Sequence, residues 1–145
     1  MQFSFRLQSL LNWKKNLEEC SQMRLAEKIK QLKIEEEEIQ RLVRTRTAKE
    51  RELNEKMRGL IAVGEYLIYK EFGENSYNDL LEKKGLKGRT ETEIQGEREH
   101  LIGLIKERKI LEKIRERRFK KFISQMEKLD QKNMDERVLQ QRGKS

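Results

Sequence analysis

A heptad repeat of apolar residues runs through the first half of the chain and constrains its fold more than any other feature. Counting every seventh residue from Leu11 to Leu67 gives nine positions, of which seven are apolar. A second one-sided pattern runs from Ile94 to about Leu139. Repeats of seven place apolar residues on one stripe of a helix and are typical of coiled coils. Two such helices of similar length predict an all-α fold, a long antiparallel two-helix coiled-coil hairpin.

The absence of proline supports long helices. A chain of this length would contain about seven prolines at average usage, whereas this one has none and is rich in Glu, Lys, Arg, Leu and Gln. These residues favour helices, and strands are not expected. Disorder is the main rival because 41% of the residues are charged. The apolar residues recur periodically, however, which disordered segments do not show.

The pattern divides one coiled-coil domain, residues 1–145, into two arms and a tip. We expect helices over about 4–57 and 91–140, joined by a tip over 59–89 that holds most of the glycines. Short helices are predicted near the tip, one ending at Gly73 and one starting at Ser76. Thr90 is the predicted N-cap of the second arm, because Glu93 follows it at capping-box spacing.

The apolar stripe of the first arm is narrow. Companion apolar residues beside the heptad positions are few, and they fall on two different sides: Ile29, Val43 and Met57 on one, Leu7 and Leu42 on the other. The run of four glutamates at 35–38 is expected to face water.

No catalytic constellation is present in the sequence. His100 is the only histidine and Cys20 the only cysteine, and they fall on different predicted arms. The glycines around residues 85–88 resemble a phosphate loop but lack its spacing and a preceding strand. We therefore expect no enzyme activity, no metal and no cofactor.

The sequence shows no targeting or membrane signal. Its longest apolar run is residues 60–63, too short for a membrane span, and its first residues lack the apolar core of a signal peptide. We expect a cytosolic protein without direct membrane insertion.

The positive charge is concentrated in the last quarter. Residues 106–145 contain 14 basic and seven acidic residues, or +7 of the net +8. Nucleic-acid binding is one interpretation, but aromatic stacking residues are not interleaved with the basic run. A solvated helix face is a second interpretation, and an acidic socket on a protein partner is the one we favour over nucleic acid.

Three segments resemble the FliJ family of the bacterial flagellar type III export apparatus. They are FSFRLQSLL at residues 3–11 with Glu18 and Glu19, YKEF at 69–72, and LDQKNMDE at 129–136. The resemblance implies a non-enzymatic stalk, an antiparallel coiled coil that enters the hexameric export ATPase ring and promotes its assembly and activity. The ATP site would belong to the partner.

The resemblance also implies where the partners bind. The ring would face the basic residues of the second arm, which are Arg115, Arg117, Arg118, Lys120 and Lys121. The cytoplasmic domain of the export gate would contact Leu42, Tyr69 and Phe72, and export chaperones are further partners. The protein would be cytoplasmic and peripherally associated with the inner-membrane export apparatus. Some relatives carry aromatic residues where this chain has Thr45 and Lys49, so its gate surface differs.

Three other functions fit the same pattern. The first is the homologous stalk of a virulence type III secretion injectisome. The second is a basic nucleic-acid-binding coiled coil, and the third is a generic homodimeric coiled coil.

Overall fold

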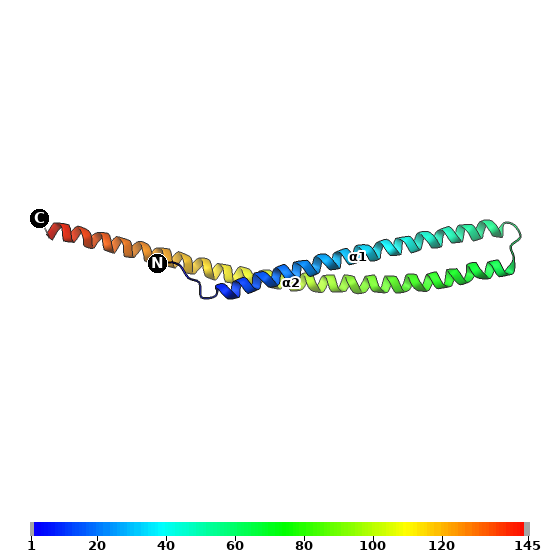
Figure 1. The fold of residues 1–145 in the computed structure, drawn as a ribbon, viewed down its shortest axis with the longest axis horizontal. Helices are drawn as coiled ribbons and strands as arrows, with labels where there is room; N and C mark the ends of the chain where they lie inside the picture. Colours follow the sequence, from blue (N-terminus) through cyan, green and yellow to red (C-terminus); the bar gives the residue numbers. More distant parts are fainter. Residues whose placement is uncertain (1, 144–145) are drawn as a thin grey trace. The chain divides into compact units, whose positions relative to one another are not determined.

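Two long helices make up almost all of the computed structural model, which describes residues 2–143. Helix α1 spans Gln8–Met57 and helix α2 spans Val63–Gly143, and the two pack against each other (Figure 1). Residues 2–143 contain no strand. The all-α fold with two long helices is therefore confirmed. The outermost limits of the predicted domain, residues 1 and 144–145, lie outside the described residues.

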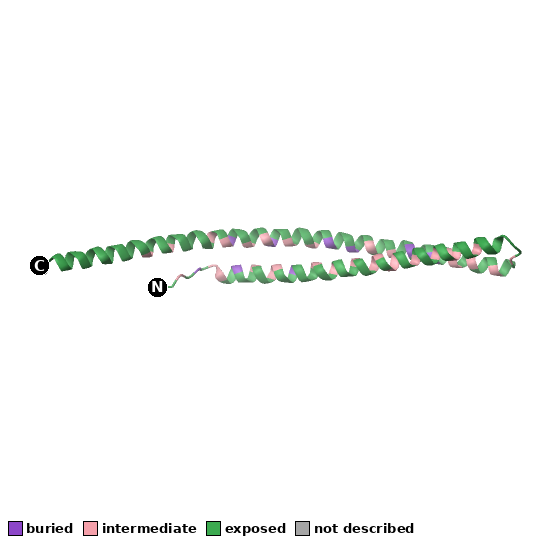
Figure 2. Ribbon diagram, turned by 90° about the horizontal axis from the view of Figure 1, so that it is seen from above, coloured by how far each residue is buried: buried purple, intermediate pink, exposed green. Residues whose placement is uncertain are grey.

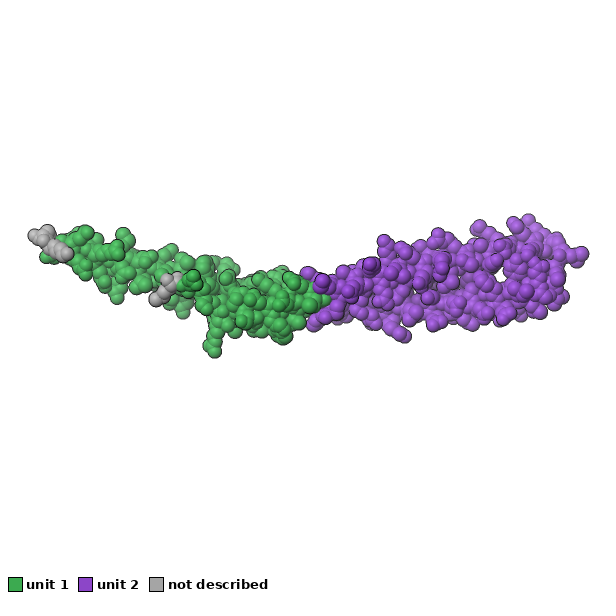
Figure 3. Space-filling model, viewed as in Figure 1, with its two compact units in different colours: residues 1–20, 101–145 green, residues 21–100 purple. Residues whose placement is uncertain are grey.

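The chain divides into two compact units, which are described separately (Figure 3). Unit 1 contains the described residues of 1–20 and 101–145, and unit 2 contains residues 21–100. Each unit pairs a stretch of α1 with a stretch of α2.

Unit 1 has an apolar core. Phe5, Leu11 and Leu111 are buried together, and Phe3 and Ile114 pack against them. Residues 2–7 are not helical, although the sequence predicted a helix from about residue 4. The reason is that this non-helical stretch buries Phe5 in the core and packs Phe3 against the rings of Phe119 and Phe122 of α2.

Unit 2 has a more polar interior. Its buried residues are Ser21, Ser76, Leu80, Thr90 and Ile94, so three of the five are polar. Figure 2 shows few buried positions along the paired helices, most of whose surface is exposed. With so little apolar surface removed from water, polar contacts between the helices decide how they pair.

The predicted short helices near the tip are wrong. Helix α2 begins at Val63 and continues through Gly73, Gly85 and Thr90 without a break. No described glycine has a positive φ, so none acts as a left-handed cap. The glycines are isolated among good helix formers, and contacts with α1 continue along this stretch, which keeps the helix intact.

The expected N-caps lie inside α2. The Oγ1 of Thr90 donates to the carbonyl oxygen of Leu86 at 3.1 Å, and the Oγ of Ser76 donates to that of Gly73 at 3.1 Å. Hydroxyls that bond back to the preceding turn satisfy themselves within a helix. The capping-box partner Glu93 instead forms an ion pair with Lys28 at 2.8 Å.

The connection between the helices is short. Only residues 58–62 lie between α1 and α2, and the amide of Gly59 donates to the carbonyl oxygen of Lys56 at 3.2 Å. The side chain of Leu60 is fully exposed, and Leu67 is 53% exposed. The last two positions of the heptad series therefore do not belong to the helix interface.

The heptad series itself is confirmed from Leu11 to Leu53, where every member is buried or half-buried. Its predicted companions are mostly wrong. Ile29, Val43 and Met57 are exposed, whereas Leu7 and Leu42 are half-buried. The positions that accompany the series in the interface are largely polar ones, namely Lys14, Ser21, Lys28, Glu35, Leu42 and Lys49.

Candidate protein-binding surfaces

Residues 2–143 contain no group of side chains suited to metal binding. No helix in that range is long and apolar enough to cross a membrane. The candidate surfaces lie on the two units.

The five predicted ring-facing residues lie on α2 in unit 1 and are all exposed. We call them the basic segment: Arg115, Arg117, Arg118, Lys120 and Lys121. Each projects from a helix that the apolar core of unit 1 anchors.

Two cations of the basic segment contact the N-terminal residues. The Nε of Arg115 donates to the Oε1 of Gln8 at 3.0 Å, and its guanidinium lies 5.6 Å from the ring centre of Phe3. Arg118 lies 5.6 Å from the ring centre of Phe5. Such cation–π contacts hold both guanidinium groups at the unit's surface.

The other three cations differ in whether their side chains have an interaction partner. Lys120 pairs with Glu116 at 3.1 Å within one turn of α2. Arg117 and Lys121 make no hydrogen bond, ion pair or ring contact within residues 2–143. These two side chains are the ones most available to an acidic partner.

Aromatic packing between the N-terminal residues and α2 occurs beside the basic segment. The ring of Phe3 meets Phe119 edge-on at 5.2 Å and is tilted against Phe122 at 5.6 Å. An open groove of about 460 Å³ beside them is lined by Leu11, Arg115 and other residues. The N-terminal residues thus pack against the part of α2 that carries the cations.

The three predicted gate-facing residues come together in unit 2. Leu42 and Phe72 line one surface groove of about 190 Å³, and Tyr69 and Phe72 line a second of about 40 Å³. All three side chains are half-buried, while Tyr66 is exposed. Tyr66, which lies three residues before Tyr69 on α2, lines neither groove.

Polar contacts frame Tyr69. Its hydroxyl donates to the Oε2 of Glu52 at 3.2 Å, and the Nζ of Lys56 lies 5.1 Å from its ring centre. Hydrogen bonds from Lys49 and Tyr69 lower the pKa of Glu52. Hydrogen bonds to Glu65 and Tyr69 raise the pKa of Lys56. The ring is held in place by Glu52 at its hydroxyl and by Lys56 over its face, and it stays partly accessible.

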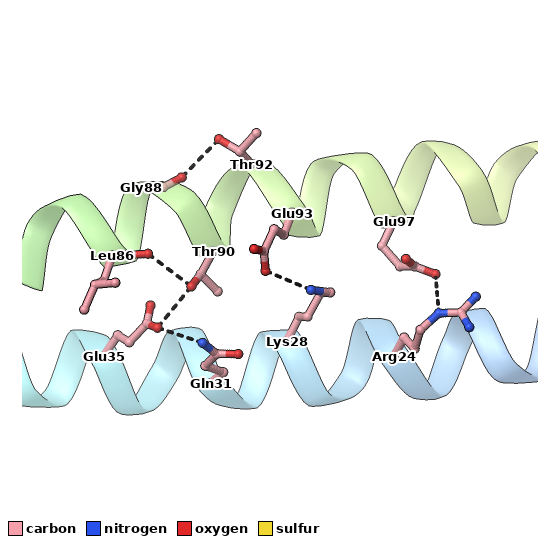
Figure 4. Close-up of polar contacts among 10 residues, drawn as sticks. All are labelled: Arg24, Lys28, Gln31, Glu35, Leu86, Gly88, Thr90, Thr92, Glu93 and Glu97. Atoms are coloured by element: carbon pink, nitrogen blue, oxygen red, sulfur yellow. Dashed lines mark hydrogen bonds and ion pairs between the residues drawn. The ribbon is translucent and has the colours of Figure 1, made fainter.

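A set of polar contacts across the two helices of unit 2 was not predicted from the sequence (Figure 4). We call it the polar seam. It joins Ser21, Arg24, Lys28, Glu35, Glu36 and Glu38 on α1 to Lys83, Lys87, Thr90, Glu93 and Glu97 on α2.

Two carboxylates of the polar seam, those of Glu97 and Glu35, each contact two polar groups through a single oxygen. The Oε1 of Glu97 accepts from the Oγ of Ser21 at 2.7 Å and from the Nε of Arg24 at 3.2 Å. The Oε1 of Glu35 accepts from the Nε2 of Gln31 at 3.0 Å and lies 3.0 Å from the Oγ1 of Thr90, so it competes with the carbonyl oxygen of Leu86 for the single proton of that hydroxyl.

The glutamate run at 35–38 was wrongly expected to face only water. Besides Glu35, Glu38 pairs with Lys83 at 3.0 Å and Glu36 lies 3.8 Å from Lys87. The signal that could have revealed this is the seven-residue spacing of Ser21, Lys28 and Glu35, with complementary groups on the second arm.

Acid is expected to weaken unit 2. The hydrogen bond from Ser21, with a contribution from Arg24, lowers the pKa of Glu97, and Lys28 lowers that of Glu93. Carboxylates whose pKa is lower in the folded state stabilise it above the unfolded pKa, and this stabilisation is lost as the pH falls through the folded pKa. The melting temperature should therefore fall as the pH drops from about 6 to about 3.

Thermal melts followed by circular dichroism at several pH values check this. Glu97→Gln should reduce the pH dependence. Glu74→Gln, at an exposed residue of the same helix without contacts, should leave it unchanged. Equal pH profiles for Glu97→Gln and the wild type would contradict the assignment.

Comparison with known proteins gives one match. A protein-family model described as "FliJ: Flagellar FliJ protein" matches residues 3–145. No curated protein and no solved structure matches the chain.

Proposed function

The chain belongs to the FliJ family of flagellar proteins, and on that premise we propose that it is the stalk that couples the export ATPase to the export gate. Members of the family are non-enzymatic components of flagellar type III export. The resemblance seen in the sequence is thereby confirmed, and the flagellar system is favoured over an injectisome.

In this proposal the two helices form an antiparallel coiled-coil hairpin. The order of contacts in unit 2 supports it. From Arg24 to Glu38 and on to Glu52 along α1, the partners on α2 run backwards, from Glu97 to Lys83 to Tyr69. A hairpin of this kind presents no active site of its own, and ATP is bound and hydrolysed by the partner ring.

The observation that carries the ring-binding role is the basic segment. It combines unpaired, exposed cations at Arg117 and Lys121 with an apolar core immediately beside them on the same helix. The helix backbone that carries these cations is already ordered, so binding does not have to order it, and exposed cations are complementary to an acidic socket. Contact with the ring would promote its assembly and its ATP hydrolysis.

The direct test is to titrate the full chain into its cognate purified export ATPase and to follow both ATP hydrolysis and hexamer formation by electron microscopy. We expect saturable stimulation accompanied by more hexamers. A flat response from an ATPase that is demonstrably active would refute the stalk role.

The gate-binding role rests on Leu42, Tyr69 and Phe72. Their half-buried side chains line two adjoining grooves, so a partner can reach apolar surface there without unfolding the unit. Export chaperones are further proposed partners. The protein would work in the cytoplasm, peripherally associated with the inner-membrane export apparatus.

Truncating Phe72 should weaken gate binding and preserve the fold. We expect Phe72→Ala to lower affinity for the cytoplasmic domain of the gate by about tenfold or more, because aromatic residues at interface centres dominate binding. Isothermal titration calorimetry measures the affinity, and circular dichroism checks helicity. Leu81→Ala, at a 51%-exposed residue of the same helix, should bind like the wild type. Loss of helicity in Phe72→Ala would instead identify Phe72 as a core residue.

A further inference from the structure

Helix α2 contains glycines at positions where no close contact requires a glycine. Gly85, Gly88 and Gly96 lie in the helix interior with ordinary helical φ values. A Cβ added at any of them would meet nothing within 4 Å. Glycine weakens a helix because it loses more backbone freedom on folding than alanine does. These three glycines therefore lower the stability of helix α2. They do not serve to let α1 approach more closely.

The helix face that meets α1 along the same stretch is held mainly by the polar seam. Its ion pairs are half-open to water: the side chains of Lys83 and Glu38 are 40% and 39% exposed, and those of Lys28 and Glu93 are 28% and 44% exposed. Exposed ion pairs contribute little to stability and are screened by salt. Ile94 is the only buried apolar residue between residues 83 and 97.

One carboxylate of the polar seam is poorly satisfied. The Oε2 of Glu35 is buried and accepts no hydrogen bond from residues 2–143. Thr90 has a single hydroxyl proton but two acceptors in range, Glu35 and the carbonyl oxygen of Leu86. Separation of the helices would return the unpaired oxygen to water, so the closed state is less favourable here than elsewhere.

We infer that residues 24–38 of α1 and 83–97 of α2 form a locally opening segment. The two stretches separate and lose their helical hydrogen bonds in one cooperative step, while the apolar core of unit 1 stays closed. Weakened helix propensity, screened ion pairs and a buried unpaired oxygen all fall within the same stretch, and each lowers the free energy of local opening. This inference does not depend on the proposed partners.

Hydrogen exchange followed by mass spectrometry on the full chain tests the inference. In the wild type, peptides covering 24–38 and 83–97 should exchange faster than those covering 104–114. Their protection should change little at low denaturant concentrations, as expected for local opening, and should fall as salt is added. Protection in 83–97 equal to that in 104–114 would overturn the inference.

Two variants locate the cause. The triple variant Gly85→Ala, Gly88→Ala, Gly96→Ala should slow exchange in 83–97 by about fivefold for each alanine. Glu35→Leu combined with Thr90→Val should slow exchange in both 24–38 and 83–97.

The matched control is Gly103→Ala, at an exposed glycine of α2 with equally open space but within unit 1. It should leave exchange in 83–97 unchanged. If Gly103→Ala and the triple variant slowed exchange equally along the whole of α2, the opening would be global and the local segment would be disproved.

Discussion

Replacing Leu11 with alanine is expected to lower the free energy of unfolding by about 2–5 kcal/mol. The side chain of Leu11 is 1% exposed and packs with Phe5 and Leu111 in the apolar core of unit 1. Its removal deletes buried methyl groups and leaves a cavity that two rigid helices cannot close. Since whole domains are stable by only about 5–15 kcal/mol, much of the stability would be lost.

Urea denaturation followed by far-ultraviolet circular dichroism measures this effect. The matched control is Leu10→Ala, one residue earlier on the same helix and 39% exposed. It should change the unfolding free energy by less than about 1 kcal/mol. Similar losses for both variants would mean that the apolar core of unit 1 does not hold the helices together.

The second large effect concerns the basic segment. The double charge reversal Arg117→Glu, Lys121→Glu should weaken stimulation of the export ATPase by about tenfold or more. Both side chains are exposed and without partners in residues 2–143, so reversal removes no contact that holds unit 1 together. Their new charges would repel an acidic socket.

The readout is the concentration of protein that gives half-maximal ATPase stimulation, with helicity checked in parallel. Lys33→Glu, Lys84→Glu makes the same change in net charge in unit 2, at two exposed lysines without contacts. It should stimulate like the wild type. Equal losses from the two variants would indicate a general charge effect, and unchanged stimulation by the first would place the ring-binding surface elsewhere.

The two long helices were predictable because their signals are local. The heptad positions from Leu11 to Leu53 lie in or near the interface as predicted, and the absence of proline removed the strongest helix breaker. The tip was mispredicted for a related reason. The signals for a helix end or start in this region are worth only about 1 kcal/mol each, and they come from Gly73, Gly85 and Thr90. Continued packing against α1 outweighs them.

The candidate surfaces were located in part. The basic segment is exposed on α2, and Leu42, Tyr69 and Phe72 line adjoining grooves. The contacts of Arg115 with the ring of Phe3 and of Arg118 with the ring of Phe5 could not be predicted, because they depend on where the non-helical residues 2–7 pack.

The sequence alone determined the helical class, the approximate extent of α1 and the placement of the positive charge, since each follows from residue type and spacing along one chain. It did not determine the length of α2, which begins at Val63 rather than near residue 91. Only the tertiary structure decided which polar residues meet. Glu35 has the same helix preference whether it faces water or Thr90, because pairing depends on the axial register of two helices. The tertiary structure likewise directed Phe3 and Phe5 away from a helix and toward the core of unit 1, where burial outweighs a further turn of α1.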